Sequence, residues 1–208
     1  AEEFLDEWTA LVKSRSGERG IFNRAGLEKQ LPARRWEAIK NERQIGLNPC
    51  GEIYLRSKQF CNLTSIVIRP NDTMESLKKK IELATLLGTY QSTLTNFGYL
   101  SKRWKENCEE ERLLGVSLTG YYDNPVIRDD KVLDALKLDS IETNKKYAKR
   151  FGINPSTAIT CVKPHGNSGQ LLGVGSGMHP WFAPYFIRRV RISHTDTLLK
   201  MARDQGVP

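Results

Sequence analysis

Side chains that can carry chemistry gather in one short segment of the chain. Asn48, Cys50 and Glu52 alternate with Pro49 and Gly51, so an amide, a thiol and a carboxylate are close neighbours in sequence. In an extended segment, these alternate side chains point to one side and would face a single ligand. A proline stiffens such a loop and a glycine admits a close neighbour, which suits a site that holds a thiol in place. The segment is therefore a candidate catalytic site.

Three further cysteines lie outside this segment. Cys61 follows Cys50 by eleven residues, directly before a predicted strand, and could return to the same pocket. Cys108 lies in a polar stretch and Cys161 inside another predicted strand, and we expect both to be structural. Because free cysteines are among the most buried residue types, plain apolar packing is the alternative for every one of them. Their spacing is typical of neither a zinc site nor a disulfide scaffold.

A glycine-rich segment that begins at Lys163 is the second candidate. It directly follows a predicted strand, and small residues at such a place let successive backbone N–H groups converge on an anion. The segment matches neither the Walker nor the dinucleotide-binding fingerprint, so phosphate binding and a merely tight turn both stay open. The histidines, His165, His179 and His194, lack the spacing of metal ligands, and we predict no metal site.

Composition limits the class of protein. The chain has 208 residues, of which 39% are hydrophobic and 27% charged, and 9% are aromatic, which excludes a disordered tail and a coiled coil. Its net charge of +8 favours anionic partners such as nucleotides. The basic residues are dispersed and no nucleic-acid-binding signature accompanies them, so we do not expect nucleic acid to be the partner. A non-catalytic basic nucleotide- or nucleic-acid-binding module stays the alternative to an enzyme.

The sequence contains no apolar run of membrane-spanning length, and its N-terminus is acidic where a signal peptide would be basic. We expect a soluble, cytoplasmic protein without a membrane partner. The sequence lacks an initiator methionine and stops just after a helical pattern, which is typical of a piece of a longer polypeptide.

Alternating strand and helix patterns predict an α/β domain with parallel strand pairing. Apolar and β-branched runs predict strands at 63–69, 113–118, 157–162 and 185–192. Helical spacing predicts helices at 4–12, ending near Ser16 and Gly17, from about 74, at 131–151 with Gly152 as cap, and at 195–204. Asp72 and Glu75 resemble a capping box before the second of these helices. Residues 17–48 are predicted to be irregular, with one short helix around 34–40.

Four stretches together resemble a known family, the ribonucleotide reductases, and within it the adenosylcobalamin-dependent class. They are SGERGIFNR at 16–24, NPCGEI at 48–53 with FCNL at 60–63, RLLGVSLTG at 112–120, and VKPHGNSGQLLGVGSGMHP at 162–180. They occur in the order typical of the family and span most of the chain. The short gap between Cys50 and Cys61 resembles the compact enzymes that reduce ribonucleoside triphosphates.

The resemblance implies a fold. It is part of a ten-stranded α/β barrel, built of two five-stranded parallel halves, with a finger loop through its centre that carries a thiyl radical. The finger loop would occupy about 44–62 and the second half-barrel about 63–208. The N-terminal half-barrel and a C-terminal redox tail would lie outside this chain. We therefore expect the chain to be inactive alone and to work with the remainder of the reductase polypeptide or a complementary split subunit.

The resemblance also implies residue roles. Cys50 would carry the thiyl radical, Asn48 and Glu52 would contact the substrate, and Cys61 would form the redox disulfide with a cysteine outside this chain. The substrate phosphates would lie at His165, Gly166, Asn167 and Ser168, although the family usually has Ser where this chain has His165. Adenosylcobalamin would generate the radical, a ribonucleoside triphosphate would be reduced to the deoxyribonucleotide for DNA synthesis, and a thioredoxin-like protein would reset the disulfide.

One alternative lies within the same family. The iron-dependent ribonucleoside-diphosphate reductases share Asn48, Cys50 and Glu52 but need a separate radical-generating subunit, so cofactor dependence separates the two classes. The non-catalytic module would bind nucleic acid in a salt-sensitive way that does not depend on Cys50, whereas a reductase would lose all turnover without this thiol.

Overall fold

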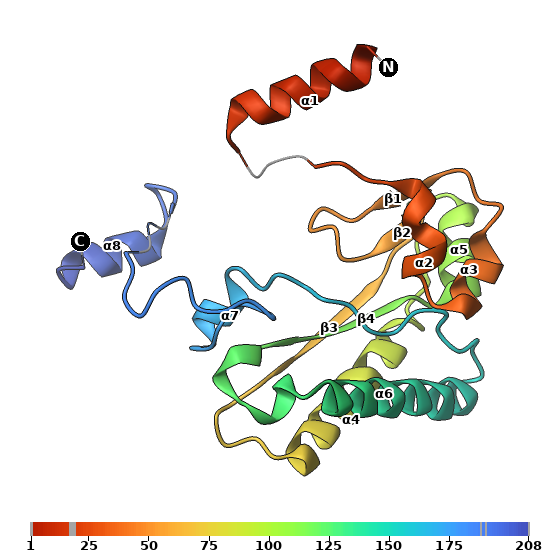
Figure 1. Cartoon of the computed structure of the whole chain (residues 1–208). Helices are drawn as coiled ribbons and strands as arrows, with labels where there is room; N and C mark the ends of the chain where they lie inside the picture. The colour runs from red at the N-terminus through yellow and green to blue at the C-terminus, as the bar shows by residue number, and fades with distance from the viewer. Residues whose placement is uncertain (1, 17–19, 188, 190, 208) are drawn as a thin grey trace.

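A parallel pair of strands with two long helices on one face forms the centre of the molecule (Figure 1). The computed structural model describes residues 2–16, 20–187, 189 and 191–207. The central elements are β3 (Asn62–Val67), β4 (Leu114–Thr119), α4 (Met74–Gln91) and α6 (Asp130–Phe151). Asn62 pairs with Leu114 and the register runs to Val67 opposite Thr119. This confirms the predicted α/β class and the parallel pairing of the first two strands.

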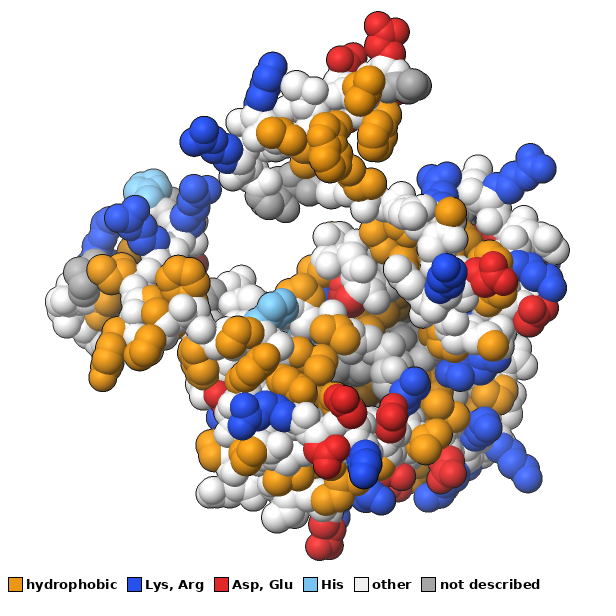
Figure 2. Space-filling model, in the orientation of Figure 1, with side chains coloured by type: hydrophobic (Ala, Val, Ile, Leu, Met, Phe, Trp, Pro, Cys, Tyr) orange, Lys and Arg blue, Asp and Glu red, His pale blue; other side chains and the backbone are white. Residues whose placement is uncertain are grey.

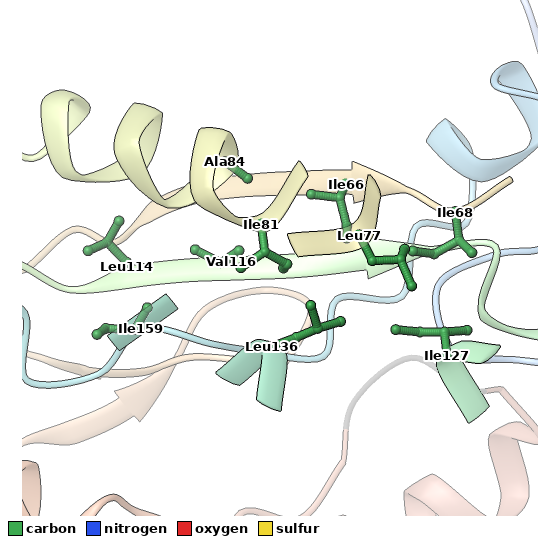
Figure 3. Packing of buried hydrophobic residues seen from close by; sticks show 10 residues of the cluster. All are labelled: Ile66, Ile68, Leu77, Ile81, Ala84, Leu114, Val116, Ile127, Leu136 and Ile159. Carbon is green, nitrogen blue, oxygen red and sulfur yellow. The ribbon is translucent and has the colours of Figure 1, made fainter. Parts of the chain in front are cut away.

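The core lies between these two strands and the two helices. Side chains of alternate strand residues meet those that recur at helical spacing on α4 and α6, as the periods of the two element types require. Figure 3 shows these side chains pointing toward one another from the two layers: Ile66, Ile68, Leu77, Ile81, Ala84, Leu114, Val116, Ile127, Leu136 and Ile159. The opposite face of the strands is left for the functional segments.

Both long helices begin and end where local chemistry favours it. Thr73 caps α4: its Oγ1 atom accepts from Ser76 N, and the Ser76 Oγ atom accepts from Thr73 N. The capping box is therefore one residue later than predicted. Asp72 instead pairs with Lys80 of α4 at 2.5 Å. Gly152 ends α6 with φ +67, as predicted, since glycine accepts this left-handed conformation without strain.

The predicted third strand is reduced to a single parallel bridge between Val116 and Thr160. Leu114 N bonds to Ala158 O, but Val116 N bonds to the very next carbonyl, Ile159 O. An advance of two residues along β4 therefore corresponds to an advance of only one residue along the neighbouring segment. This β-bulge interrupts the ladder of hydrogen bonds. The segment lies where the strand was predicted, but without regular strand geometry.

A small hairpin unit packs beside the central strands. It contains η1 (Arg24–Gly26), α2 (Leu27–Gln30), α3 (Ala33–Ile39), β1 (Ile45–Leu47), β2 (Tyr54–Arg56) and α5 (Lys102–Glu111). The short helix around 34–40 is confirmed as α3, whereas the hairpin and the other helices were not predicted. Its core is formed by Leu27, Leu31, Ile39 and Ile45.

The two ends of the chain carry helices with open apolar faces. They are α1 (Glu2–Ser14) and α8 (Thr197–Asp204), both close to their predicted ranges. The predicted end of the first helix near Gly17 lies outside the described residues. Apolar side chains gather along one side of α1 in Figure 2, among them the exposed Phe4 and Trp8. None of the described helices is long and apolar enough to cross a membrane.

The predicted strand at 185–192 is wrong for the residues that the structure describes. Residues 188 and 190 lie outside the described part, and the others are in neither a strand nor a bridge. Tyr185 and Ile187 are more than nine-tenths exposed, so the β-branched pattern has no described neighbour to pair with. Three short helices complete the description: η2 (Tyr121–Asp123), η3 (Val126–Arg128) and α7 (Ser168–Leu171).

Candidate active site

The segment with the reactive side chains forms the tight tip of the β1–β2 hairpin. Gly51 N donates to Asn48 O at 2.9 Å, which closes a turn with Pro49 at its second position, as such turns favour. Ile53 N donates to the Asn48 side-chain oxygen at 3.0 Å. The tip is thus not extended, and the sequence argument that all three side chains project to one side is wrong. Cys50 is exposed at the tip.

The side chain of Glu52 turns inward and is buried. It is only 2% exposed, and Lys163 Nζ donates to its Oε1 atom at 3.0 Å. Its Oε2 atom is buried and has no hydrogen-bonding partner among the described residues. Burial alone raises the pKa of the Glu52 carboxyl, but hydrogen bonds, above all that from Lys163, outweigh it and leave the pKa below its usual value. The carboxylate is therefore ionised, and one of its oxygens has no hydrogen-bonding partner among the described residues.

Lys163 connects the two reactive groups of the tip. Its Nζ atom lies 3.8 Å from the Cys50 sulfur as well as 3.0 Å from Glu52. The pKa of the Lys163 ammonium is raised, chiefly by its hydrogen bond to Glu52. Sequence reasoning placed Lys163 only at the start of the glycine-rich segment and gave it no role. Its position directly after the predicted third strand was the signal that it could reach the tip of the β1–β2 hairpin.

The hairpin packs at Gly115 on the face of β4 that is opposite the two long helices. A side chain on Gly115 would begin 2.4 Å from the Leu63 side chain, 3.1 Å from the Cys161 sulfur and 3.2 Å from the Ile53 side chain. Any other residue would force these neighbours apart. Gly115 therefore lets the residue after Glu52 pack directly on the strand.

Cys61 and Cys161 lie near the buried carboxylate. Burial raises the pKa of the Cys61 thiol, and the charge of Glu52 raises it further. The same two causes, again with burial the larger, raise the pKa of Cys161 to about 12. Both thiols are therefore protonated near neutral pH. Cys161 was expected to be structural, and it lies in the electrostatic surroundings of Glu52 and Cys61.

Cys108 has a structural position. It is buried on α5, and its sulfur accepts from Phe60 N at 3.3 Å, at the point where the chain leaves the hairpin.

His165 faces the strands. It is a non-glycine residue with φ +53, and its ring lies 2.9 Å from Ser65 Oγ and 3.3 Å from Ser117 Oγ through Nε2. Its Nδ1 atom lies 3.0 Å from Ser168 Oγ. Burial, aided by the Lys163 cation, lowers the pKa of His165, so the neutral ring is favoured. The imidazole thus connects the glycine-rich turn to β3 and β4 by hydrogen bonds with Ser65 and Ser117.

Comparison with known proteins relates this arrangement to a family. No family model matches the chain. Two relatives are named adenosylcobalamin-dependent ribonucleoside-triphosphate reductase. The one from Lactobacillus acidophilus is 29% identical, and the match covers 77% of this chain and 25% of the relative. The one from Levilactobacillus brevis is also 29% identical, and the match covers 92% of this chain and 29% of the relative. The chain is similar to part of these reductases. It spans about a quarter of their length.

Solved structures agree with this resemblance. A crystal structure of a B12-dependent, class II ribonucleotide reductase matches 68% of this chain and 23% of its own, with a TM-score of 0.55 and 27% identity. The alpha subunit of the class Id ribonucleotide reductase of Actinobacillus ureae covers all of this chain and 44% of its own, with a TM-score of 0.65 and 17% identity, which shows a shared fold. The resemblance seen in the sequence is confirmed, and the residue roles it implies stay predictions.

Proposed function

We propose that this chain supplies the radical-bearing finger loop and part of the barrel of an adenosylcobalamin-dependent ribonucleoside-triphosphate reductase. One observation carries the proposal: the buried Glu52 carboxylate keeps Oε2 without a described partner, beside a cation that also lies near Cys50. Leaving a buried polar atom unsatisfied is costly, so such an atom beside two reactive groups is a place where a ligand would bind. A substrate hydroxyl is the ligand that this oxygen would accept a hydrogen bond from.

The chemistry follows from the three functional groups. A thiyl radical on Cys50 takes the hydrogen atom from the 3′ carbon of the ribose, while Glu52 takes the proton of the 3′ hydroxyl as general base. The 2′ hydroxyl then leaves as water after protonation by a thiol, for which the protonated Cys61 is suited. Cys61 and a partner cysteine supply two electrons and end as a disulfide, and Cys50 returns its hydrogen to the 3′ carbon. A thioredoxin-like dithiol would reduce the disulfide.

The finger tip fits a cofactor that approaches from outside the strands. Cys50 is exposed, and a side chain on Gly51 would meet no atom within 4 Å. The residues that this chain would present to adenosylcobalamin are Pro49, Cys50 and Gly51. When bound, the cofactor supplies the oxidising equivalent that removes the hydrogen atom from the Cys50 thiol.

The glycine-rich turn is the proposed place for the substrate phosphates. Gly166, Asn167 and Ser168 form the turn itself, whereas the His165 ring is directed at Ser65 and Ser117 of the strands. We therefore assign His165 an indirect part in phosphate binding, through the shape of the turn. Asn48, which closes the finger tip through its side-chain oxygen, would orient the sugar hydroxyls.

The remaining architecture is proposed from the same resemblance. Residues of about 44–62 would form the finger loop and those of about 63–208 part of the second half of a ten-stranded barrel, of which β3 and β4 are two parallel strands. Because the chain matches about a quarter of each relative, the activity is proposed for the polypeptide or split complex in which this chain works.

The test is deoxyribonucleotide formation from a ribonucleoside triphosphate and a dithiol, with and without adenosylcobalamin. We expect product only with the cofactor, and none from Cys50→Ala. The control is Cys108→Ala, which removes a thiol outside the site and should keep turnover. Activity without cobalamin but with a metal-radical subunit would transfer the protein to the iron-dependent class. Inactivity in both, together with salt-sensitive nucleic-acid binding, would favour the non-catalytic module.

A further inference from the structure

We propose that Lys163 is a positioning residue of the reductase site, which holds one oxygen of Glu52 and leaves the other to the substrate. The inference rests on the proposed function. Lys163 Nζ lies 3.0 Å from Glu52 Oε1, and Glu52 Oε2 has no hydrogen-bonding partner among the described residues. The two oxygens of one carboxylate thus have different environments, and only the second lacks a hydrogen-bonding partner among the described residues, which a ribose hydroxyl would supply.

The backbone of Lys163 is fixed on both sides. Its N–H donates to Ser117 Oγ of β4 at 3.0 Å. Its carbonyl oxygen lies only 2.6 Å from the place where a side chain would begin on Gly177, so the two segments are in direct contact. The Lys163 side chain therefore starts from a backbone held by β4 and by Gly177, and its ammonium is placed by the hydrogen bond to Glu52.

The same ammonium sets the distance between the base and the radical cysteine. It lies 3.8 Å from the Cys50 sulfur while it binds Glu52, so it spans the two side chains of the finger tip. Cys50 is exposed on a turn, and Lys163 is the charged side chain that the described residues place beside it. A thiol and a base that act on one sugar must be held at a constant separation, and a shared cation does this.

Other titratable groups near Glu52 cannot replace this cation. Cys61 faces it from the segment before β3, and Cys161 from the segment beside β4; both thiols are neutral. His165 faces it from the glycine-rich turn, and burial lowers the pKa of its ring. The Arg35 cation, which also acts on Cys61, is paired with Glu111. Without Lys163, Glu52 would keep only the hydrogen bonds from the Asn48 side chain and its own backbone. Burial, the largest influence on this carboxyl, then favours the protonated form. A protonated Glu52 cannot accept the 3′ hydroxyl proton.

The experiment compares Lys163→Met, Lys163→Arg and a control, Lys102→Met, in the full reductase polypeptide with adenosylcobalamin. Lys102 is an exposed lysine on α5. For Lys163→Met we expect kcat to fall about 100-fold near neutral pH, the order of magnitude of a lost general base, with little change in KM. The acid limb of the kcat profile should move to higher pH, because the Glu52 pKa rises when its cation is removed. Lys163→Arg should restore part of the rate, and Lys102→Met should behave as wild type.

A second readout does not need turnover. Isotope-edited infrared spectra of the Glu52 carboxyl, with Glu52→Gln to identify its band, should show the ionised form at neutral pH in wild type and the protonated form in Lys163→Met. An ionised Glu52 in Lys163→Met, or an unchanged acid limb, would overturn the role of Lys163. If wild type makes no deoxyribonucleotide, the proposed function fails, and the infrared band alone then decides whether Lys163 controls Glu52. Thermal unfolding of each variant shows whether it is folded.

Discussion

Arg35 and Glu111, which are 76 residues apart in the chain, form a buried ion pair at 3.0 Å. Their side chains are 2% and 0% exposed. Arg35 also donates to Tyr54 O at 2.6 Å, and Gln59 Nε2 donates to Glu111 Oε2 at 2.5 Å. Both hydrogen bonds reach the segment that follows the hairpin tip, at Tyr54 of β2 and at Gln59 after it. The pair therefore anchors the base of the hairpin that carries Cys50 and Glu52 to α5.

Glu111→Gln should destabilise the protein by about 3–5 kcal/mol, because it leaves the Arg35 charge buried without its counter-ion. Urea unfolding measures this directly. The matched control is Glu106→Gln on the same helix, whose exposed partners are Lys102 and Arg103, and it should change stability by no more than about 0.5 kcal/mol. Equal effects of the two substitutions would show that the Arg35 pair does not anchor the hairpin.

Gly177→Ala tests the close contact with the segment that carries Lys163. Gly177 has φ +56 and a new side chain would begin 2.6 Å from Lys163 O, whereas Gly173 has φ +67 and open space around it. Both substitutions strain the backbone by about 1–2 kcal/mol, but only Gly177→Ala adds a clash with a backbone atom. We expect Gly177→Ala to lower the melting temperature clearly more than Gly173→Ala. Similar losses would mean that the contact can relax.

Asp72 should make stability depend on pH. Burial raises the pKa of its carboxyl, but hydrogen bonds from Lys80, Arg69 N and Ser76 outweigh this and hold the pKa below its usual value. A carboxyl with a lowered folded pKa contributes stability above its unfolded pKa, and this contribution disappears as the pH falls through the folded pKa. Asp72→Asn should therefore cost about 1–3 kcal/mol at neutral pH, and the difference from wild type should shrink below about pH 4.

The measurement is urea unfolding of both proteins between neutral and acid pH. The control substitution is Asp196→Asn, which changes the exposed N-cap residue of α8. A difference between Asp72→Asn and wild type that stays constant as the pH falls would contradict the prediction.

Long helices and strands were predictable from the sequence, because burial of one side gives their apolar residues a regular spacing. The helices α4 and α6 and the strands β3 and β4 show this. The hairpin was not predictable, since each of its strands has three residues, too few to establish a period. The helix α5 was missed for a different reason: its buried face is polar, and Glu111 is buried through an ion pair that no pattern of hydrophobicity reveals.

The candidate site could be proposed from residue types in the sequence, but its geometry could not be predicted. Cys50, Glu52 and Asn48 were identified from their spacing, yet the argument assumed an extended segment, whereas Pro49 and Gly51 form a turn. Lys163 was missed because its partner is 111 residues away in the chain. The ring of His165 turns to the serines of two strands, and only the pairing of these strands brings their hydroxyls together.

The four cysteines should react with iodoacetamide in an order set by exposure and by pKa. Cys50 is exposed, while Cys61, Cys108 and Cys161 are at least partly buried and have raised pKa values. Alkylation needs the thiolate, and a thiol with a pKa of about 12 has only about one thiolate in ten thousand molecules at pH 8. In the folded protein, Cys50 should therefore be labelled first and Cys161 at least about 100-fold more slowly.

Peptide mass spectrometry after timed labelling measures each rate, and Cys50→Ser should remove the fast phase alone. In urea all four cysteines should react at similar rates, so equal rates for Cys50 and Cys161 in the native protein would show that Cys161 is not held in the buried position beside Glu52.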